Sequence, residues 1–276
     1  MTVTTVPTVT LRAAAMERFR IELKSFFRNR AAAFFTFLLP IMMLLIFGSL
    51  FNFKLSGPPG TEPISSHRYL SAGLLASVVL STAFSGLAIS VASEQHDGLL
   101  KRLAGTPLPR AAYLIGKLAT ITVLTALTLV VMFAIGIAFF DLALPSTAKQ
   151  WAVLAAVLSG GLIASALMGL AMTRFIPNSR SAAAIVQPPY LFLFMTSGIF
   201  FSVADMPNWM RIATSLFPLK WMAQGMRFAL LPEWFASQEP AKSWELGWVV
   251  GMVGLWVVVG AVLCRWWFRW DRRTDS

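Results

Sequence analysis

The segment LATITVLTALTLVVMFAIGIAFF, residues 118–140, contains no charged residue and is long enough to cross a lipid bilayer. About 20 apolar residues span roughly 30 Å of hydrocarbon as a helix, because each residue advances the helix by 1.5 Å. Outward from this segment, similar apolar blocks recur along a chain of 276 residues that is 57% hydrophobic and only 13% charged. A soluble domain is typically about 25% charged. The composition therefore predicts an all-α integral membrane protein.

Six transmembrane helices are predicted from the apolar blocks. Their bounds are residues 31–53, 69–92, 118–140, 151–173, 182–203 and 246–267. The first block follows a long, mostly polar segment, and no cleavage pattern of small residues comes closely after it, which favours a span over a signal peptide. A soluble protein with buried helices is the alternative, and it predicts shorter helices that each carry a polar stripe.

The positive charges divide unequally between the two sides of the membrane that six spans create. Of the 23 Lys and Arg residues, 16 fall on one side, in the N-terminal segment, the second and fourth loops, the C-terminal segment and the adjoining end of the last span. Loops rich in Lys and Arg stay in the cytoplasm, so residues 1–30 and the tail at 268–276 are predicted to be cytoplasmic. The net charge of +11 follows from this topology, and nucleic-acid binding is not needed to explain it.

The segment before the first span predicts an amphipathic interfacial helix. A helical period between positions 11 and 30 separates an apolar face from a charged face, with Ile21 and Glu22 as exceptions. The apolar set is Ala15, Met16, Phe19, Leu23, Phe26 and Phe27, and the charged set is Glu17, Arg18, Arg20, Lys24 and Arg28. The helix is interpreted either as a positive topology anchor on lipid headgroups or as an elbow helix that also contacts a cytoplasmic partner.

The polar stretch SEQHDGLLKRLAGTPLPRAAYLIGK, residues 93–117, separates the second and third spans. Gly and Pro bracket an apolar and basic run that is long enough for one or two helical turns. The leucines of this run, Leu99, Leu100 and Leu103, would form an apolar docking knob. Lys101 and Arg102 would form a charged rim around it. Because a chain reversal needs only about two to eight residues, the extra length predicts a docking surface for a cytosolic protein. A loop that rests on lipid is the alternative.

Two sequence blocks resemble the type-2 ATP-binding-cassette (ABC) transporter permeases. The first block comprises Glu94, Gly98, Leu99, Leu103, Thr106, Pro107, Tyr113, Leu114, Gly116 and Lys117. The second, GIFFSVADMPNWMRIATSLFPLKWMAQGMR at residues 198–227, is similar to the drug-exporter branch with its daunorubicin-resistance permeases. The resemblance implies a dimer of two permeases around a central pathway in the bacterial inner (plasma) membrane. It also implies that each coupling helix sits in a groove of a cytosolic ATPase subunit.

The resemblance assigns the coupling role to a set of residues in the second loop. They are Glu94, Gly98, Leu99, Leu100, Lys101, Arg102, Leu103, Thr106 and Pro107. Glu94 is expected to hold the junction between helix and loop, or else to act as a simple helix cap. The chain has no G-x-x-x-x-G-K-[ST] loop to cradle phosphates. ATP and Mg²⁺ are therefore expected on the partner ATPase, and no catalytic, metal or cofactor site is expected in this chain.

The loop before the last span contains an aromatic and Met-rich segment, residues 206–231, with three cations. Those charges make a free hairpin across the bilayer costly. Two short amphipathic re-entrant helices that dip into the outer leaflet are predicted instead, with Trp209, Pro218 and Trp221 as an exit gate. Aromatic anchoring at the membrane boundary is the alternative.

A substrate pathway is predicted from polar and aromatic residues inside two spans. The candidates are Ser81, Ser85, Gln187, Phe194, Met195, Phe200 and Phe201. Polar side chains on a span favour either a pathway or contacts between helices, and helix packing remains the alternative for each Ser. Aromatic and Met side chains suit an adaptable apolar pocket.

These features together predict the permease subunit of an ATP-driven exporter of hydrophobic or amphipathic compounds, such as drugs or lipids. A permease for polysaccharides or polyprenyl-linked glycans is the alternative within the same family. An ion-coupled secondary transporter is a second alternative, although it would need acids or His inside the spans, and His67 and His96 both fall in predicted loops. An intramembrane enzyme is disfavoured because no H-E-x-x-H or G-x-S-x-G motif occurs.

Overall fold

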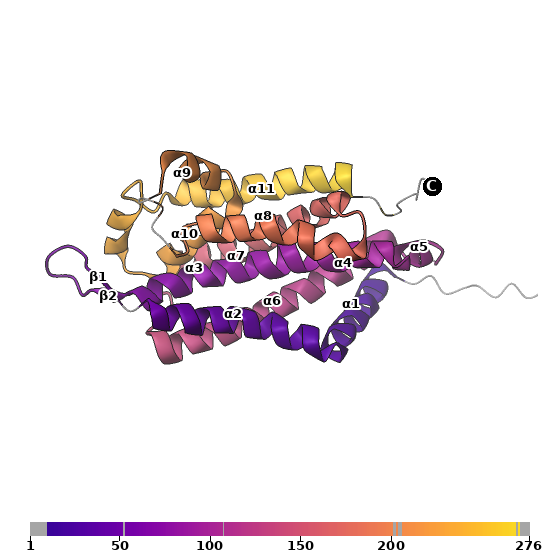
Figure 1. Cartoon of the computed structure of the whole chain (residues 1–276), viewed down its shortest axis with the longest axis horizontal. Coiled ribbons are helices and arrows are strands. Elements are labelled where there is room, and N and C mark those ends of the chain that lie inside the picture. Colours follow the sequence, from indigo (N-terminus) through magenta and orange to yellow (C-terminus); the bar gives the residue numbers. More distant parts are fainter. Residues whose placement is uncertain are drawn as a thin grey trace, which may run out of the picture.

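The computed structural model describes residues 10–51, 53–106, 108–200, 203, 206–268 and 270. Over these residues the chain is almost entirely helical, and the described strands are the short antiparallel pair β1 (Lys54–Leu55) and β2 (Ile64–Ser65). Figure 1 shows the long helices side by side with their axes roughly aligned, and α1 lying across one end. The prediction of an all-α protein agrees with this architecture.

Among the described residues, five helices are long and apolar enough to cross a membrane. They are α2 (Arg30–Leu50), the continuous helix α3 (Ser66–Leu80), η1 (Ser81–Gly86) and α4 (Leu87–His96), α6 (Arg110–Phe140), α7 (Ala148–Met172) with its 3-10 extension η2 (Thr173–Phe175), and α11 (Leu246–Trp267). The helix Ser66–His96 lies at the centre, because 78% of its most apolar window is buried against 17% for α2 and α11. The outer helices therefore leave most of their apolar surface available to lipid.

The fifth predicted span, residues 182–203, is a shorter helix than expected. The short turn η3 (Ser179–Ser181) leads into α8 (Ala182–Thr196), which has 15 residues and ends in a series of bends. At 1.5 Å per residue α8 extends only about 22 Å. Gly198, at φ 75°, adopts the left-handed conformation that favours glycine and stops the helix. A sixth crossing by α8 alone therefore stays a prediction.

The N-terminal helix α1 (Leu11–Arg28) forms as expected and packs across the start of α6. Asn29 forms the bend between α1 and α2. The Asn29 backbone N–H bonds to the carbonyl groups of Ser25 and Phe26, and its side chain accepts from the Ala32 N–H at 3.1 Å, which starts α2. Arg18 departs from the predicted basic face, because it is buried against α6 instead of facing headgroups.

The end of the molecule far from α1 is closed by α9 (Asn208–Ser215), α10 (Pro218–Leu230) and the 3-10 turn η5 (Glu233–Gln238) (Figure 1). Every residue of α10 is buried, and the helix packs among α3, α7 and α11. The prediction of two amphipathic helices dipping into lipid is therefore wrong for α10, because the protein covers all of its residues, the polar ones included. Arg227, for example, bonds through Nε to Glu239 Oε1 at 2.6 Å and through Nη1 to the Gly198 carbonyl at 3.0 Å.

The three predicted gate residues, Trp209, Pro218 and Trp221, lie on two different helices and differ in exposure. Pro218 occupies the first turn of α10, where its missing N–H costs nothing. Trp221 is 6% exposed and donates its Nε1–H to the Ser215 carbonyl at 2.8 Å, whereas Trp209 on α9 is 62% exposed. Of the pair α9 and α10, it is α9 that has the exposed apolar face expected of a helix that contacts lipid.

Candidate functional site

The short helix α5 (Leu99–Ala104) protrudes from the end of the molecule where α1 begins (Figure 1). Gly98, at φ 73°, makes the sharp turn from α4 into α5, and no atom would lie within 4 Å of an added Cβ. Lys101 and Arg102 are exposed, as expected for a charged rim. Leu100 is 1% exposed, so it anchors α5 to the protein interior and cannot belong to the predicted docking knob.

A groove of about 550 Å³ runs between α5 and α1. Leu103 and Thr106 line it on one side, and Ala13 and Ile21 line it on the other. Thr106 is exposed and donates its Oγ1–H to the Leu103 carbonyl at 2.7 Å, which ends the helix. Leu99 is half-buried, and Pro107 lies outside the described residues. The surface offered by α5 is therefore shared with α1.

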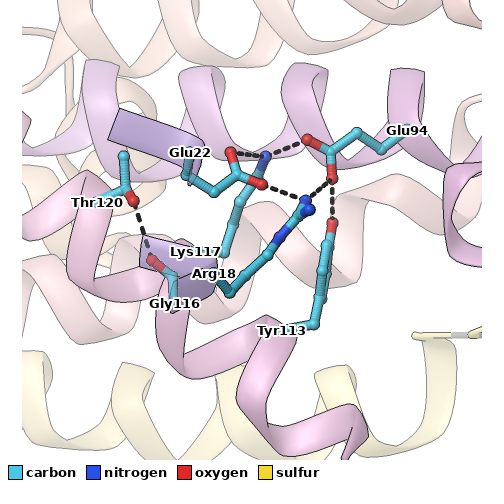
Figure 2. A network of polar contacts seen from close by, with 7 residues as sticks. All are labelled: Arg18, Glu22, Glu94, Tyr113, Gly116, Lys117 and Thr120. Carbon is cyan, nitrogen blue, oxygen red and sulfur yellow. Dashed lines mark hydrogen bonds and ion pairs between the residues drawn. The ribbon is translucent and has the colours of Figure 1, made fainter. Parts of the chain in front are cut away.

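Behind α5, a buried ion network joins α1, α4 and α6. The name refers to Arg18, Glu22, Glu94, Tyr113 and Lys117, which point toward one another in Figure 2. Glu22 and Glu94 each contact both cations, so the charges alternate around a ring. Lys117 Nζ lies 2.8 Å from Glu22 Oε2 and also bonds to Glu94 Oε1, while Arg18 Nη2 lies 3.3 Å from Glu94 Oε2 and bonds to Glu22 Oε1.

Tyr113 and Gly116 complete the packing of the ion network. Tyr113 donates its hydroxyl hydrogen to Glu94 Oε2 at 2.6 Å, and the Arg18 guanidinium lies 5.0 Å from the centre of the Tyr113 ring. Gly116 faces α1 so closely that an added Cβ would lie 2.8 Å from Arg18 Cγ. The spacing of Tyr113, Gly116 and Lys117 on α6 thus brings a hydroxyl donor, a close helix contact and a cation to one place.

The charges of the ion network balance, with two carboxylates against two cations. Lys117 is only 2% exposed, and isolated charges at such a depth would be costly to desolvate. Each charge has a partner on a different helix, and Arg18 and Glu22 also pair within α1. The Glu94 carboxylate bonds to three side chains of α1 and α6, so the alternative of a simple helix cap does not describe its contacts.

A cavity of about 520 Å³ opens beside the ion network, between α1, α2, η1, α4 and α6. Glu22, Glu94 and Lys117 form one part of its wall. Hydroxyl and amide side chains line much of the rest, including Ser25, Asn29, Thr36, Thr82, Ser90 and Thr120. The ion network therefore both joins the three helices and forms part of the wall of a cavity.

A second cavity, here called the span pocket, has about 240 Å³ and lies between α2, α3, η1 and α8. It brings together four of the predicted pathway residues with two methionines and a tyrosine, namely Ser81, Ser85, Gln187, Phe194, Met43, Met132 and Tyr190. Ser81 and Ser85 belong to η1, a π-helical turn inside the central helix, and such turns are frequent at functional sites.

The remaining pathway candidates lie elsewhere. Phe200 is buried against Phe47 and Phe194, with ring centres 4.6 and 5.1 Å apart. Met195 is exposed on α8 and does not line the span pocket. Phe201 lies outside the described residues. Sequence periodicity alone could not separate these positions, because α8 turns at Gly198 rather than continuing as a straight helix.

Two members of the ion network, Arg18 and Glu22, were not among the predicted site residues. One signal for them was present in the sequence, because Glu22 interrupted the apolar face of the predicted interfacial helix and lies four residues after Arg18. Over the described residues, no three His, Cys, Asp or Glu side chains lie close enough to hold a metal ion. The site is thus a set of charge contacts between helices.

Comparison with known proteins places this geometry in a family context. The family model for the ABC-2 type transporter matches residues 18–231. One curated relative, named "Putative transport permease ycf38" and from Porphyra purpurea, is 23% identical over 234 residues, which cover 81% of this chain and 78% of that protein. The matched region of the family model contains the whole ion network, α5, the span pocket and α10.

Proposed function

Because the chain belongs to the ABC-2 type transporter family, we propose that it is the membrane-spanning permease subunit of an ATP-driven exporter. A separate cytosolic ATPase would bind ATP and Mg²⁺ and dock on the surface formed by α5 and α1. The ion network is the observation that carries this proposal, since it lies directly behind α5 and joins three helices by charged contacts.

The contacts support a mechanism for transmitting movement. Leu100 fixes α5 to the protein interior, while Gly98 provides the turn between α5 and α4. A force on α5 would therefore pull on the end of α4, where Glu94 bonds to α1 and α6. Since buried charge pairs are costly to separate, the three helices would move together. Movement of α4 would in turn displace η1, which forms part of the span pocket.

The span pocket supports an apolar or amphipathic cargo, such as a drug or a lipid. Most of its wall is formed by Leu, Met, Val, Pro and aromatic side chains, with a few hydroxyl and amide groups. Met side chains adapt to ligands of different shape, whereas a glycan would need many more hydrogen-bonding partners. The ion network lies beside α5 instead of in the middle of the central helix, which favours coupling to a partner over an ion-binding site.

The proposal includes the topology and assembly expected of such a subunit. The chain would be a multi-pass protein of the bacterial inner membrane with both termini in the cytoplasm. In support, α1 begins and α11 ends at the same end of the molecule as α5 (Figure 1). A second permease, either an identical or a different chain, would pair with this one, and the surfaces of α2 and α11 that remain uncovered are available for lipid or for that partner.

The proposal is tested by reconstitution with candidate ABC ATPase subunits from the same organism. We expect the purified chain alone to hydrolyse no ATP and to co-purify with one of these ATPases when both are produced together. Inverted vesicles that contain the complex should accumulate a fluorescent amphiphile only when ATP is supplied. An ATPase variant without its phosphate-binding Lys is the matched control. It should bind this chain equally well, but the resulting complex should not transport the amphiphile. ATP turnover by the isolated chain, or accumulation without ATP, would contradict the proposal.

A further inference from the structure

At the end of the molecule far from α5, a cavity of about 770 Å³ opens between α9, the start of α10 and the start of α11. We call it the tryptophan cavity. Its wall is formed by Val203, Asn208, Arg211, Ile212, Ser215, Leu216, Lys220, Trp221, Pro240, Ala241, Glu245, Trp248 and Met252. This volume is within the range of about 300 to 1,000 Å³ that is usual for small-molecule sites.

The charged groups of the tryptophan cavity leave an excess of one positive charge. Arg211 and Lys220 are its cations, and Glu245 is its one carboxylate. Glu245 Oε2 already accepts a hydrogen bond from Gln224 Nε2 at 3.4 Å. Among the residues that the structure describes, neither Arg211 nor Lys220 forms a salt bridge. Within the described part of the chain, the cavity therefore presents two cationic groups without a carboxylate at contact distance.

Lys220 is the more unusual of the two cations because it is only 4% exposed. Its Nζ lies 3.4 Å from the centre of the Trp221 ring, so the ammonium is held against an aromatic face. Burial lowers the pKa of Lys220 to about 8, and attraction to Glu245 and Glu239 opposes that effect. The group thus stays charged at neutral pH. A buried ammonium in this position gains stability from an anion that enters the cavity.

The apolar part of the wall is large and firmly held. The Trp221 ring stacks on Trp248 with centres 6.2 Å apart, and its Nε1–H is bound to the Ser215 carbonyl. Ile212 and Leu216 on the α9 side are exposed, which extends the apolar surface out of the cavity. Trp248 is also exposed at the first turn of α11, where aromatic side chains mark a membrane boundary in spanning helices.

We propose that the tryptophan cavity binds the anionic headgroup of an amphiphile, with a phosphate between Arg211 and Lys220 and the apolar part of the molecule against Trp248, Ile212 and Leu216. The combination of an apolar exit with two cations that have no salt bridge to a described residue discriminates against neutral and zwitterionic molecules. This site is separate from the span pocket, which α2, α3, η1 and α8 form. The proposal does not depend on transport, so it stands or falls independently of the proposed function.

The test measures lipid binding to the full-length chain purified in a neutral detergent. Native mass spectrometry with increasing phosphatidylglycerol gives an apparent dissociation constant, and phosphatidylcholine with the same acyl chains is the zwitterionic comparison. We expect phosphatidylglycerol to bind more tightly. Arg211→Gln should weaken its binding by at least about tenfold, the usual scale for losing a hydrogen bond to a charged group. Lys220→Met, which keeps the length of the side chain, should have a similar effect.

Lys242→Gln is the matched control, because Lys242 is an exposed cation close in sequence to the cavity but not part of its wall. It should leave phosphatidylglycerol binding unchanged. If Lys220→Met does not fold, Arg211→Gln decides the outcome, since Arg211 is only partly buried. Inorganic phosphate alone forms a third arm. Millimolar phosphate could compete with phosphatidylglycerol in the unchanged chain but not in Arg211→Gln. That result would support the anion site and indicate that its ligand is a soluble anion. Equal affinity for both lipids, or phosphatidylglycerol binding insensitive to Arg211→Gln, would overturn the proposal.

Discussion

Glu94 shows how one side chain can link separate helices. Its Oε1 bonds to Lys117 on α6, while its Oε2 accepts from Tyr113 on α6 and from Arg18 on α1. Both lone-pair-bearing oxygens are thus engaged at the end of α4, four residues before the turn at Gly98. A carboxylate is needed at this position because three donors, two of them charged, converge on it.

We expect Glu94→Gln to lower the free energy of unfolding by about 3 kcal/mol, because Lys117 and Arg18 would then share the single carboxylate of Glu22. Thermal unfolding in detergent, followed by circular dichroism, measures the effect. Removing the surplus cation in Glu94→Gln/Lys117→Met should recover part of the loss. Glu17→Gln is the control, since its pair with Arg20 is exposed and should contribute less than about 1 kcal/mol. Equal stability of the two single variants would show that the buried contacts contribute little.

The leucines of α5 have two different roles, anchoring the helix and lining the groove beside α1. Leu100 is buried and holds α5 to the protein, whereas Leu103 borders the groove between α5 and α1. A helix of six residues is too short to be stable alone. The position of α5 must therefore come from the buried Leu100 and from the turn at Gly98, which leaves the opposite side of the helix available to a partner.

Leu103→Asp and Leu100→Asp separate docking from folding. We expect Leu103→Asp to weaken binding of the ATPase by at least tenfold, about 1.4 kcal/mol, without changing the unfolding temperature. Leu100→Asp should instead destabilise the chain by at least about 3 kcal/mol, because it removes a core side chain and buries a charge. Pull-down with the ATPase and thermal unfolding are measured on the same preparations. Undiminished ATPase binding by a folded Leu103→Asp variant would place the docking surface elsewhere.

On the scale of the whole molecule, α10 and the ion network occupy opposite ends of the helical body (Figure 1). At one end, α1, α4 and α6 are joined by charges. At the other end, the fully buried α10 fills the space between α3, α7 and α11, and Arg227 joins it to Glu239 and to the turn at Gly198. The exposed helix α9 precedes the buried helix α10. Of these two helices, α9 is therefore the one that is free to contact lipid or cargo.

The two tryptophans of this end should differ when each is replaced. Trp221→Ala should cost about 3 to 5 kcal/mol of stability because it opens a cavity in the interior. Trp209→Ala should change stability by less than about 0.5 kcal/mol, yet lower the efflux of a fluorescent amphiphile per intact complex if α9 gates the exit, as we expect. Unchanged efflux by Trp209→Ala in reconstituted vesicles would leave α9 with an anchoring role only.

The sequence by itself determined the class of this protein and the approximate places of five long apolar helices. Uncharged segments such as residues 118–140 must form helices in a membrane, because every backbone group then needs an internal partner, and five such helices are found. The tertiary structure decided which polar side chains meet. Arg18 and Glu22 lie on α1, far in sequence from Glu94 and Lys117, and helical periodicity cannot tell a charge that faces lipid headgroups from one that faces a buried partner. The burial of α10 and the shortness of α8 were likewise decided by packing, because both depend on the turn at Gly198 and its contact with Arg227.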